Sequence, residues 1–483
     1  MSGEQKARQQ NAQRKTANKQ ARRKQKKQQS LYNPDFPVRE ENACGIDIGS
    51  KEMYVAVPAD RDKSPVRSFG TYTEDLMKLV QWLKDCKITT VAMESTGVYW
   101  IAVYQMLEAA GLRVCLVNAR HMKNVPGRRT DWHECQWIQY LHSVGLLRGA
   151  FRPEQAICRM RSLLRHRGEM VAMSSQHILH MQKAMREMNL NLEITISDIT
   201  GVTGLAIIDA IVAGERDPAK LAEFRDPRTK ATEETIRKSL EGDYREELIH
   251  ILRQSLEFYR YTRKQITETD ELIQKYMREV ESKVDLKAKP YVAPKEKRRS
   301  QARKRDRFEQ GSFDMGEESY RIWGVDITAI PGLGGLNAYA LMGEIGPDLS
   351  SFPSSKNFVS YLALCPDNDI SGGKVLWRGS RKLNTRAGQI FRMAAGTLHR
   401  AHNPLGVYLR RMKGILGPAG AIYATSRKLA RIFFAMVTLG REYDESKLGM
   451  APEARRRQEE KRLRKQAKAL GYTLAPVEKT AQA

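Results

Sequence analysis

The order of the apolar runs in residues 43–118 constrains the fold of this chain more than any other feature. Three short runs come first, with the close spacing typical of antiparallel hairpins. Two amphipathic helical patterns then alternate with two further apolar runs. We therefore expect strands at 43–48, 52–58, 66–72, 89–94 and 113–118, and helices at 74–85 and 98–110.

Three paired strands followed by helix, strand, helix and strand is the order of ribonuclease-H-like folds. In that architecture, acidic residues collect at the active edge of the sheet and on a following helix. The sequence therefore predicts an α/β domain of this class at residues 41–150, and mainly helical regions after it.

Four acidic residues stand where such an edge would form. Asp47 lies in the first predicted strand and Glu94 ends the fourth, while Asp131 and Glu134 lie three apart at the start of a helix-like segment. Carboxylates gathered in one place repel one another unless a cation lies between them, and Mg²⁺ takes oxygen ligands of this kind. Acids also favour a helix N-terminus by capping alone. For Asp131 and Glu134 both interpretations stay open at this point.

The charge of the chain indicates the class of its partners. The 483 residues include 82 Lys and Arg against 56 Asp and Glu, a formal net charge of +26. Such a chain is expected to bind nucleic acid or another anionic surface. No apolar run approaches the ~20 residues of a membrane-spanning helix, so we expect no membrane contact. The six cysteines contain no Cys-x-x-Cys pair, which argues against a zinc site or a disulfide framework.

The rest of the chain divides by composition. Residues 1–40 form a basic tail that cannot bury a core and is expected to be disordered alone; it is either a solubilising tail or an arm that orders on nucleic acid. The pattern of residues 151–285 predicts a helical and coiled-coil region. Two charged helices around 232–280 are expected there, and they suit a coiled-coil-like hairpin. The remaining predicted segments are a basic linker at 286–319, a mainly helical domain at 320–445 and a charged tail at 446–483.

A second group of candidate residues surrounds Ser371, which two glycines follow. A serine hydroxyl can attack a phosphodiester when cations stabilise the developing charge and a group removes its proton. By composition alone a phosphate-binding turn is the simpler interpretation, because Ser-Gly turns are common. The cations expected to contact nucleic acid are Lys374, Arg378, Arg381, Lys382 and Arg386, together with Arg161 and Arg165 in the central region.

A Gly-rich turn occurs in two related copies, at 198–205 and 326–335, each followed by an apolar helical pattern. Such a turn presents backbone N–H groups and the positive end of a helix to a phosphate. A tight turn between packed helices needs the same glycines. We expect phosphate contact at Gly332 and Gly334 and leave the first copy open.

Several motifs together resemble the DEDD transposases of insertion sequence family 110. The N-terminal pattern of that family appears in Gly45-Ile-Asp47, Met93-Glu-Ser-Thr-Gly97, Val117-Asn-Ala-Arg120 and Arg129-Thr-Asp-Trp-His-Glu-Cys-Gln136. Its C-terminal pattern appears in Ile330-Pro-Gly-Leu-Gly334, Phe352, Phe358-Val-Ser-Tyr-Leu-Ala-Leu-Cys-Pro366, Ser371-Gly372 and Arg392-Met-Ala-Ala395. The resemblance covers most of residues 43–445 in the expected order.

The resemblance implies a RuvC-like N-terminal domain, a C-terminal transposase domain with a nucleophilic serine, and a coiled-coil region that supports a homo-oligomer, a dimer or tetramer. Asp47, Glu94, Asp131 and Glu134 fall on the metal-binding acids, so Mg²⁺ is the expected cofactor, and Ser371 falls on the nucleophile. The fourth acid of the family is usually Asp, whereas this chain has Glu134. Members are recombinases guided by a structured bridge RNA that pairs with donor and target DNA, in the nucleoid-associated cytoplasm of bacteria or archaea.

We therefore expect a transposase that cleaves and exchanges DNA strands through a phosphoserine link at Ser371. In the alternative, a metal-dependent DNA nuclease or junction resolvase, the same acids activate water and Ser371 is only a turn residue. A third, non-enzymatic possibility is an RNA-binding scaffold on an inactive ribonuclease-H-like fold.

Overall fold

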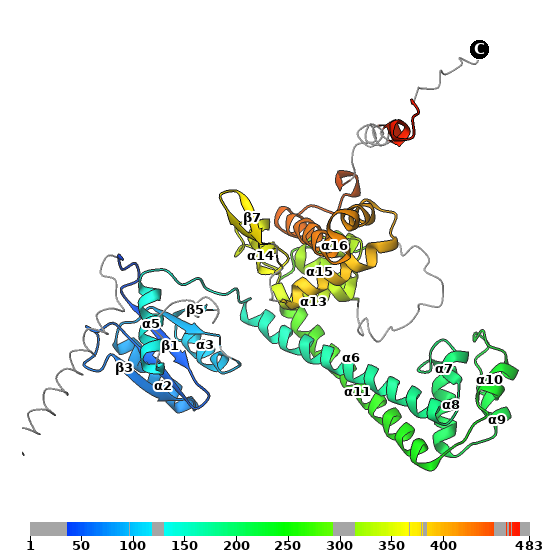
Figure 1. Ribbon diagram of the computed structural model, residues 1–483. Helices are drawn as coiled ribbons and strands as arrows, with labels where there is room; N and C mark the ends of the chain where they lie inside the picture. Colours follow the sequence, from blue (N-terminus) through cyan, green and yellow to red (C-terminus); the bar gives the residue numbers. More distant parts are fainter. Residues whose placement is uncertain are drawn as a thin grey trace, which may run out of the picture. The chain divides into compact units, whose positions relative to one another are not determined.

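The computed structural model describes residues 36–95, 97–117, 130–292, 314–366, 368–377, 379, 384–448, 460, 463–464 and 466–473. The chain divides after Arg152 into two compact units, an α/β unit and a largely helical one (Figure 1). Within the described residues, no helix has the length and apolar character needed to cross a bilayer. Most of the two predicted tails and of the predicted linker lies outside them.

The first unit contains one five-stranded sheet in the order β3-β2-β1-β4-β5. β1 pairs antiparallel with β2, and β2 with β3, whereas β1, β4 and β5 are parallel. This mixed sheet agrees with the predicted ribonuclease-H-like arrangement, and the strands begin and end within two residues of the predicted positions. They are β1 (Ala43–Ile48), β2 (Glu52–Ala56), β3 (Val66–Gly70), β4 (Thr90–Glu94) and β5 (Arg113–Val117).

Two helices cover one face of this sheet, α2 (Thr73–Asp85) and α3 (Trp100–Ala109). Leu79 of α2 and Leu107 of α3 belong to the same buried cluster as Ile46 of β1. Because side chains alternate along a strand, every second residue of β1 points into this layer. The residues between them face the other side.

The opposite face is covered by α5 (Asp131–Ser143). Ile138 of α5 packs with Ala92 of β4, and Cys135 lies against β2. The helix comes very close to the centre of β1 at Gly45, where a Cβ would lie 2.3 Å from the carbonyl oxygen of Cys135. Glycine at this position therefore sets the distance between α5 and the sheet.

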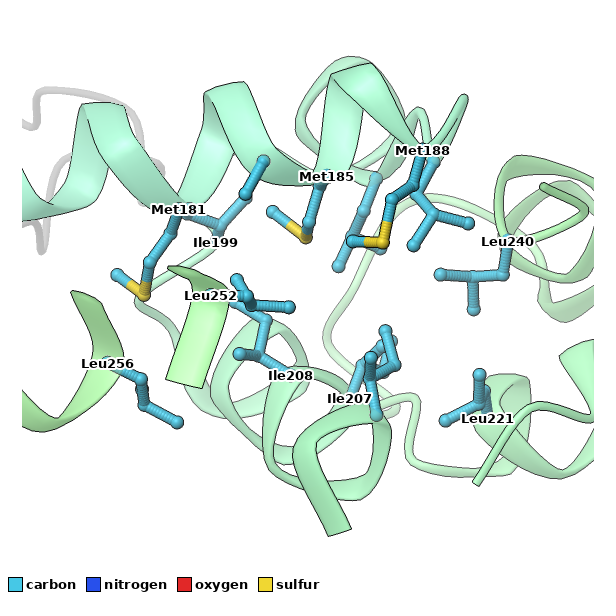
Figure 2. Packing of buried hydrophobic residues seen from close by; sticks show 14 of the residues in the cluster. Met181, Met185, Met188, Ile199, Ile207, Ile208, Leu221, Leu240, Leu252 and Leu256 are labelled. Atoms are coloured by element: carbon cyan, nitrogen blue, oxygen red, sulfur yellow. The ribbon is translucent and has the colours of Figure 1, made fainter. Parts of the chain in front are cut away.

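The second unit begins with two long paired helices, α6 (Gln155–Glu187) and α11 (Glu246–Glu279). The chain between them forms a small bundle whose core includes Met181 of α6, Ile208 of α8 and Leu252 of α11 (Figure 2). The short helices of this bundle are α7 (Leu192–Thr195), α8 (Val202–Ala213), α9 (Pro218–Glu223) and α10 (Glu233–Ser239).

The predicted hairpin of two charged helices around 232–280 is wrong. That segment contains the short helix α10 and one long helix, α11, whose partner is α6. The buried seam of α11 repeats every seven residues, as in a coiled coil. Its members include Leu252, Tyr259, Ile266 and Ile273. Helix α6 was not predicted as the partner of α11 because the two helices lie far apart in the sequence.

The C-terminal part of this unit packs around an aromatic cluster centred on Phe433. The Phe433 ring contacts Trp323, Phe358 and Phe391, with centroids 5.2, 5.9 and 5.7 Å away. These rings come from four helices, which accounts for the mutual packing of the domain. The elements here are α12 (Met315–Trp323), η2 (Ile327–Ala329), α13 (Gly335–Ile345), α14 (Ser355–Tyr361), β6 (Asp369–Ser371), β7 (Lys374–Trp377), α15 (Arg386–Thr397), η3 (Leu398–Arg400), α16 (Pro404–Leu439) and η4 (Glu445–Leu448).

Candidate active site

Asp47 and Glu94 lie at the carboxyl ends of two neighbouring parallel strands. Ile46 of β1 is in register with Met93 of β4, and each acid is the next residue along its strand. Two residues before Glu94, Ala92 packs against α5. Because residues two apart share a face of the sheet, both acids belong to the face that α5 covers.

Asp131 and Glu134 occupy the first turn of α5. They precede Cys135 and Ile138, the residues buried against the sheet, by four positions each. Residues four apart lie on the same side of a helix. The side of α5 that carries these two acids is therefore the side that faces the sheet.

The direction of α5 brings its first turn to the carboxyl end of β1. The Gln139 side chain donates a hydrogen bond to the carbonyl oxygen of Ala43 at 3.3 Å, at the start of β1. The backbone of Cys135, one turn earlier in α5, approaches Gly45. The helix thus runs antiparallel to β1: Gln139 lies at Ala43 and Cys135 at Gly45. One turn further toward the start of α5, Asp131 therefore lies toward Asp47.

Electrostatic effects support this placement. The pKa of the Cys135 thiol is raised to about 12, first by burial and then by the charges of Asp47 and, more weakly, Asp131. The pKa of Tyr54, the residue opposite Asp47 in the β1–β2 register, is also raised. Its main cause is the hydrogen bond from the tyrosine hydroxyl to Glu52, with a smaller contribution from Asp131. The structure therefore brings Asp47 and Asp131 within electrostatic reach of one side chain.

The donor set at this edge consists of carboxylates, the ligands that hard divalent cations prefer. In the part of the chain that the structure describes, no three His, Cys, Asp or Glu side chains are close enough together to hold a metal ion. The chemistry of the four acids fits such an ion, although within the described residues their side chains do not form a complete set of ligands. Their roles as metal ligands stay a prediction.

Ser371 and Lys374 flank the turn of the β6–β7 hairpin and are directly opposite each other. Gly372 and Gly373 form the turn with φ values of 56° and 78°. A two-residue hairpin loop of type I′ needs positive φ at both positions, which glycine adopts without strain. Opposite residues in an antiparallel pair share a face, with Cβ atoms about 4.5–5.5 Å apart. Both side chains are exposed, so a hydroxyl and an ammonium group emerge together at the hairpin tip.

The other cations predicted around Ser371 are only partly described. Arg386 is exposed at the first position of α15. Arg378, Arg381 and Lys382 lie outside the described residues.

Arg161 and Arg165 of α6 both bind α13. The Arg161 guanidinium donates to the carbonyl oxygens of Gly343 and Glu344 at 2.9 and 2.8 Å. The Arg165 guanidinium donates to both carboxylate oxygens of Glu344 at 2.9 and 2.8 Å. These bonds join α6 to the C-terminal part of the unit, and contact with nucleic acid stays a prediction for both arginines.

The two Gly-rich turns begin alike. Asp198 accepts a hydrogen bond from the amide of Thr200 at 2.9 Å, and Asp326 accepts one from the amide of Thr328 at the same distance. The internal similarity seen in the sequence therefore extends to the local structure. Both turns lead into a helix, α8 and α13.

Packing accounts for one of the two glycines expected to contact phosphate. Gly332 has φ 91°, and a Cβ there would lie 2.5 Å from the carbonyl oxygen of Ala394. The tight-turn interpretation therefore explains Gly332. Gly334 is exposed before α13, with no atom within 4 Å of a Cβ placed there. Phosphate contact at both positions stays a prediction.

Two features of the site do not follow from the motifs in the sequence. Gly45 sets the approach of α5 to the sheet, which its place in the Gly-Ile-Asp motif does not reveal. Lys374, expected to contact nucleic acid, lies directly opposite Ser371. The pair Gly372-Gly373 carried the missing signal, because two glycines between short strands predict a two-residue hairpin turn and hence its register.

Two family models match the chain. One, described as Transposase, matches residues 44–190, from β1 through α6. The other, described as Transposase IS116/IS110/IS902 family, matches residues 326–408 and includes the hairpin with Ser371. No curated protein matches the chain.

Proposed function

Because the chain belongs to the IS116/IS110/IS902 family of transposases, which are DNA-processing enzymes, we propose that it cuts and rejoins DNA strands with Ser371 as the nucleophile. One observation carries this assignment of the nucleophile. Ser371 is exposed at a hairpin tip directly opposite Lys374. A cation beside the hydroxyl favours its ionisation and stabilises negative charge on an attacked phosphate.

In the proposed step, Ser371 Oγ forms a bond to the phosphorus of a DNA backbone phosphate. The bond from phosphorus to one sugar oxygen breaks, the hydroxyl proton is lost to solvent and the released sugar oxygen gains a proton. The resulting phosphoserine ester conserves the energy of the phosphodiester. Attack by a sugar hydroxyl of another strand then rejoins DNA without an external energy source.

The carboxylates at the sheet edge supply the second part of the proposed chemistry. Asp47, Glu94, Asp131 and Glu134 would hold a divalent cation, Mg²⁺ in this proposal, and when bound such a cation polarises a phosphate oxygen. The alignment of Asp47 and Glu94 at adjacent strand ends supports this role. Glu134 would reach one methylene further than the aspartate that is usual in the family.

The selection of DNA sequence is proposed to rest on RNA. The family resemblance implies a structured guide RNA that pairs with donor and target DNA. It also implies a homo-oligomeric protein that is cytoplasmic and associated with the nucleoid. The formal net charge of +26 suits a protein that holds several nucleic-acid backbones at once. Base pairing would then choose the sequence while the protein contacts backbone and shape.

The test is covalent capture. The full-length protein is purified with the RNA that accompanies it, that RNA is sequenced, and labelled DNA duplexes are built to match its unpaired segments. With Mg²⁺ present, we expect a denaturation-resistant protein–DNA adduct whose modified peptide contains Ser371. The Ser371→Ala variant should form no adduct and cut no strand, whereas Ser350→Ala, at an exposed serine of the same domain, should behave as the parent protein.

Different outcomes separate the alternatives. Strand cleavage that survives in Ser371→Ala would exclude the serine mechanism and point to a water-activating nuclease. Removal of divalent cations with EDTA, and the Asp47→Asn change, should each stop cleavage in both enzymatic mechanisms. If no cleavage occurs with any DNA while RNA stays bound, the chain acts as an RNA-binding scaffold.

A further inference from the structure

Helix α16 is broken in its middle. Gly417 has φ 74° and ψ 175°, outside the helical region, and Pro418 follows it. Lys428 Nζ lies 4.5 Å from the centre of the Tyr408 ring. A straight helix with a rise of 1.5 Å per residue would place these residues about 30 Å apart. The two halves of α16 therefore fold back against each other and bring their side chains together.

Two cations share the Tyr408 ring. The Arg411 guanidinium carbon lies 5.7 Å from the ring centre, and Lys428 takes the closer position. Each cation is attracted to the ring, but the two repel each other. Burial lowers the pKa of Lys428, and the charge of Arg411 lowers it further. Neither cation forms an ion pair with a carboxylate of the described residues.

The surrounding sequence provides no counter-charge. Residues 370–441 contain fourteen Lys and Arg and no Asp or Glu. The first acid after this segment, Glu442, already lies 3.6 Å from the ammonium of Lys289 and accepts a hydrogen bond from the amide of Asp326. Within the described residues no acid neutralises Arg411 and Lys428 beside the Tyr408 ring, so their charge is available to an external anion.

We infer that Tyr408, Arg411 and Lys428 form a binding site for a backbone phosphate of a nucleic-acid strand. A guanidinium offers a planar set of N–H donors and an ammonium a compact charge, the two groups that most often bind phosphate. A phosphate between them removes their mutual repulsion. Arg411 and Lys428 lie beyond residues 326–408, the range of the second family match, and the site does not depend on Ser371 as nucleophile.

The test measures binding of the full-length protein to a 30-base-pair duplex of random sequence and to single-stranded RNA of the same length, over a range of salt concentrations. Each phosphate contact contributes about 0.9 to the slope of log affinity against log salt on duplex DNA and about 0.7 on single strands. The double variant Arg411→Gln/Lys428→Met, which keeps the lysine stem, removes the one proposed phosphate contact and should lower the slope by about 0.9 on duplex DNA or about 0.7 on single strands. A loss on DNA alone assigns the site to DNA, and a loss on RNA alone to RNA.

The control is Lys264→Met, which removes one positive charge from an exposed lysine of α11 whose ammonium lies 3.9 Å from Glu268. An unchanged slope in the double variant, or an equal change in Lys264→Met, would overturn the site. If circular dichroism shows that the double variant is less folded, the salt dependence of the single variant Arg411→Gln is used as the test instead. Arg411 is exposed, and its loss should lower the duplex slope by about 0.9. The measurement is repeated in Ser371→Ala, where the same change is expected.

Discussion

At the scale of the residue, Gly45 decides how the acids are brought together. A Cβ at this position would lie 2.2 Å from the amide nitrogen of Gln139 and 2.3 Å from the carbonyl oxygen of Cys135. Both atoms belong to the backbone of α5, so relief requires the whole helix to move. Such a movement would carry Asp131 and Glu134 away from the strand ends.

We predict that Gly45→Ala destabilises the first unit by about 1–3 kcal/mol, the usual cost of overpacking a core, and lowers strand cleavage. Urea unfolding and the cleavage assay measure the two effects. The matched control is Gly168→Ala in α6, where a Cβ meets no atom within 4 Å. Alanine should there stabilise the helix by about 0.5–1 kcal/mol. A Gly45→Ala variant as stable as the parent would contradict this account of α5.

His142 makes the stability of the first unit depend on pH. Burial lowers the pKa of its imidazole; the charge of Glu40 opposes this shift and that of Arg113 adds to it. The ring nitrogen Nε2 lies 2.8 Å from the hydroxyl of Thr90. Since the folded state binds a proton less readily than the unfolded state, stability is full above about pH 6.5, the ordinary value for histidine. It declines as the pH falls through the window below that value.

The change His142→Gln should remove this part of the pH dependence. We expect the parent protein to lose more stability than the variant between pH 7 and pH 5, as measured by urea unfolding at each pH. Carboxylates titrate in the same range in both proteins, so only the difference between them reports on His142. Parallel curves would show that His142 does not contribute.

At the scale of the element, α6 and α11 are held by an ion pair inside their interface. Arg167 Nε lies 2.5 Å from Asp270 Oδ1, and the two side chains are only 5% and 3% exposed. The pKa of Tyr339 of α13 is raised by burial and then by the charge of Asp270, while Arg167 opposes it. The pair therefore lies where the two long helices meet α13.

We predict that Asp270→Ala destabilises the second unit by about 3–5 kcal/mol, because a buried guanidinium loses its carboxylate. The double variant Arg167→Met/Asp270→Leu should recover most of the loss, since an apolar pair of similar size has no charge to desolvate. Chemical unfolding measures both. The control Glu268→Ala, which breaks the exposed pair with Lys264, should cost less than about 1 kcal/mol. Equal losses in the two single variants would contradict the buried role of Asp270.

At the scale of the whole molecule, the four acids, Ser371 and the acid-free segment 370–441 are distributed over the two units. The first match holds the four acids in the α/β unit, and the second holds Ser371 in the helical unit. The proposed reaction draws on both. The segment without acids, 370–441, belongs to the second unit. The excess of positive charge over the whole chain favours nucleic acid as a partner.

The sequence by itself determined the elements of the first unit and the residue types of its site. Strand and helix patterns are local, so the β1–β5 order and the positions of Asp47, Glu94, Asp131 and Glu134 along their elements could be predicted. The hairpin register of Ser371 and Lys374 was also encoded locally, in two glycines.

Tertiary structure alone decided which distant surfaces meet. The pairing of α11 with α6, the approach of α5 to Gly45 and the cluster of Tyr408 with Lys428 all join residues far apart in the chain. Periodicity shows that a helix has an apolar or charged face, but not which face it packs against. That choice depends on the shapes and volumes of all the side chains that fill the interface together.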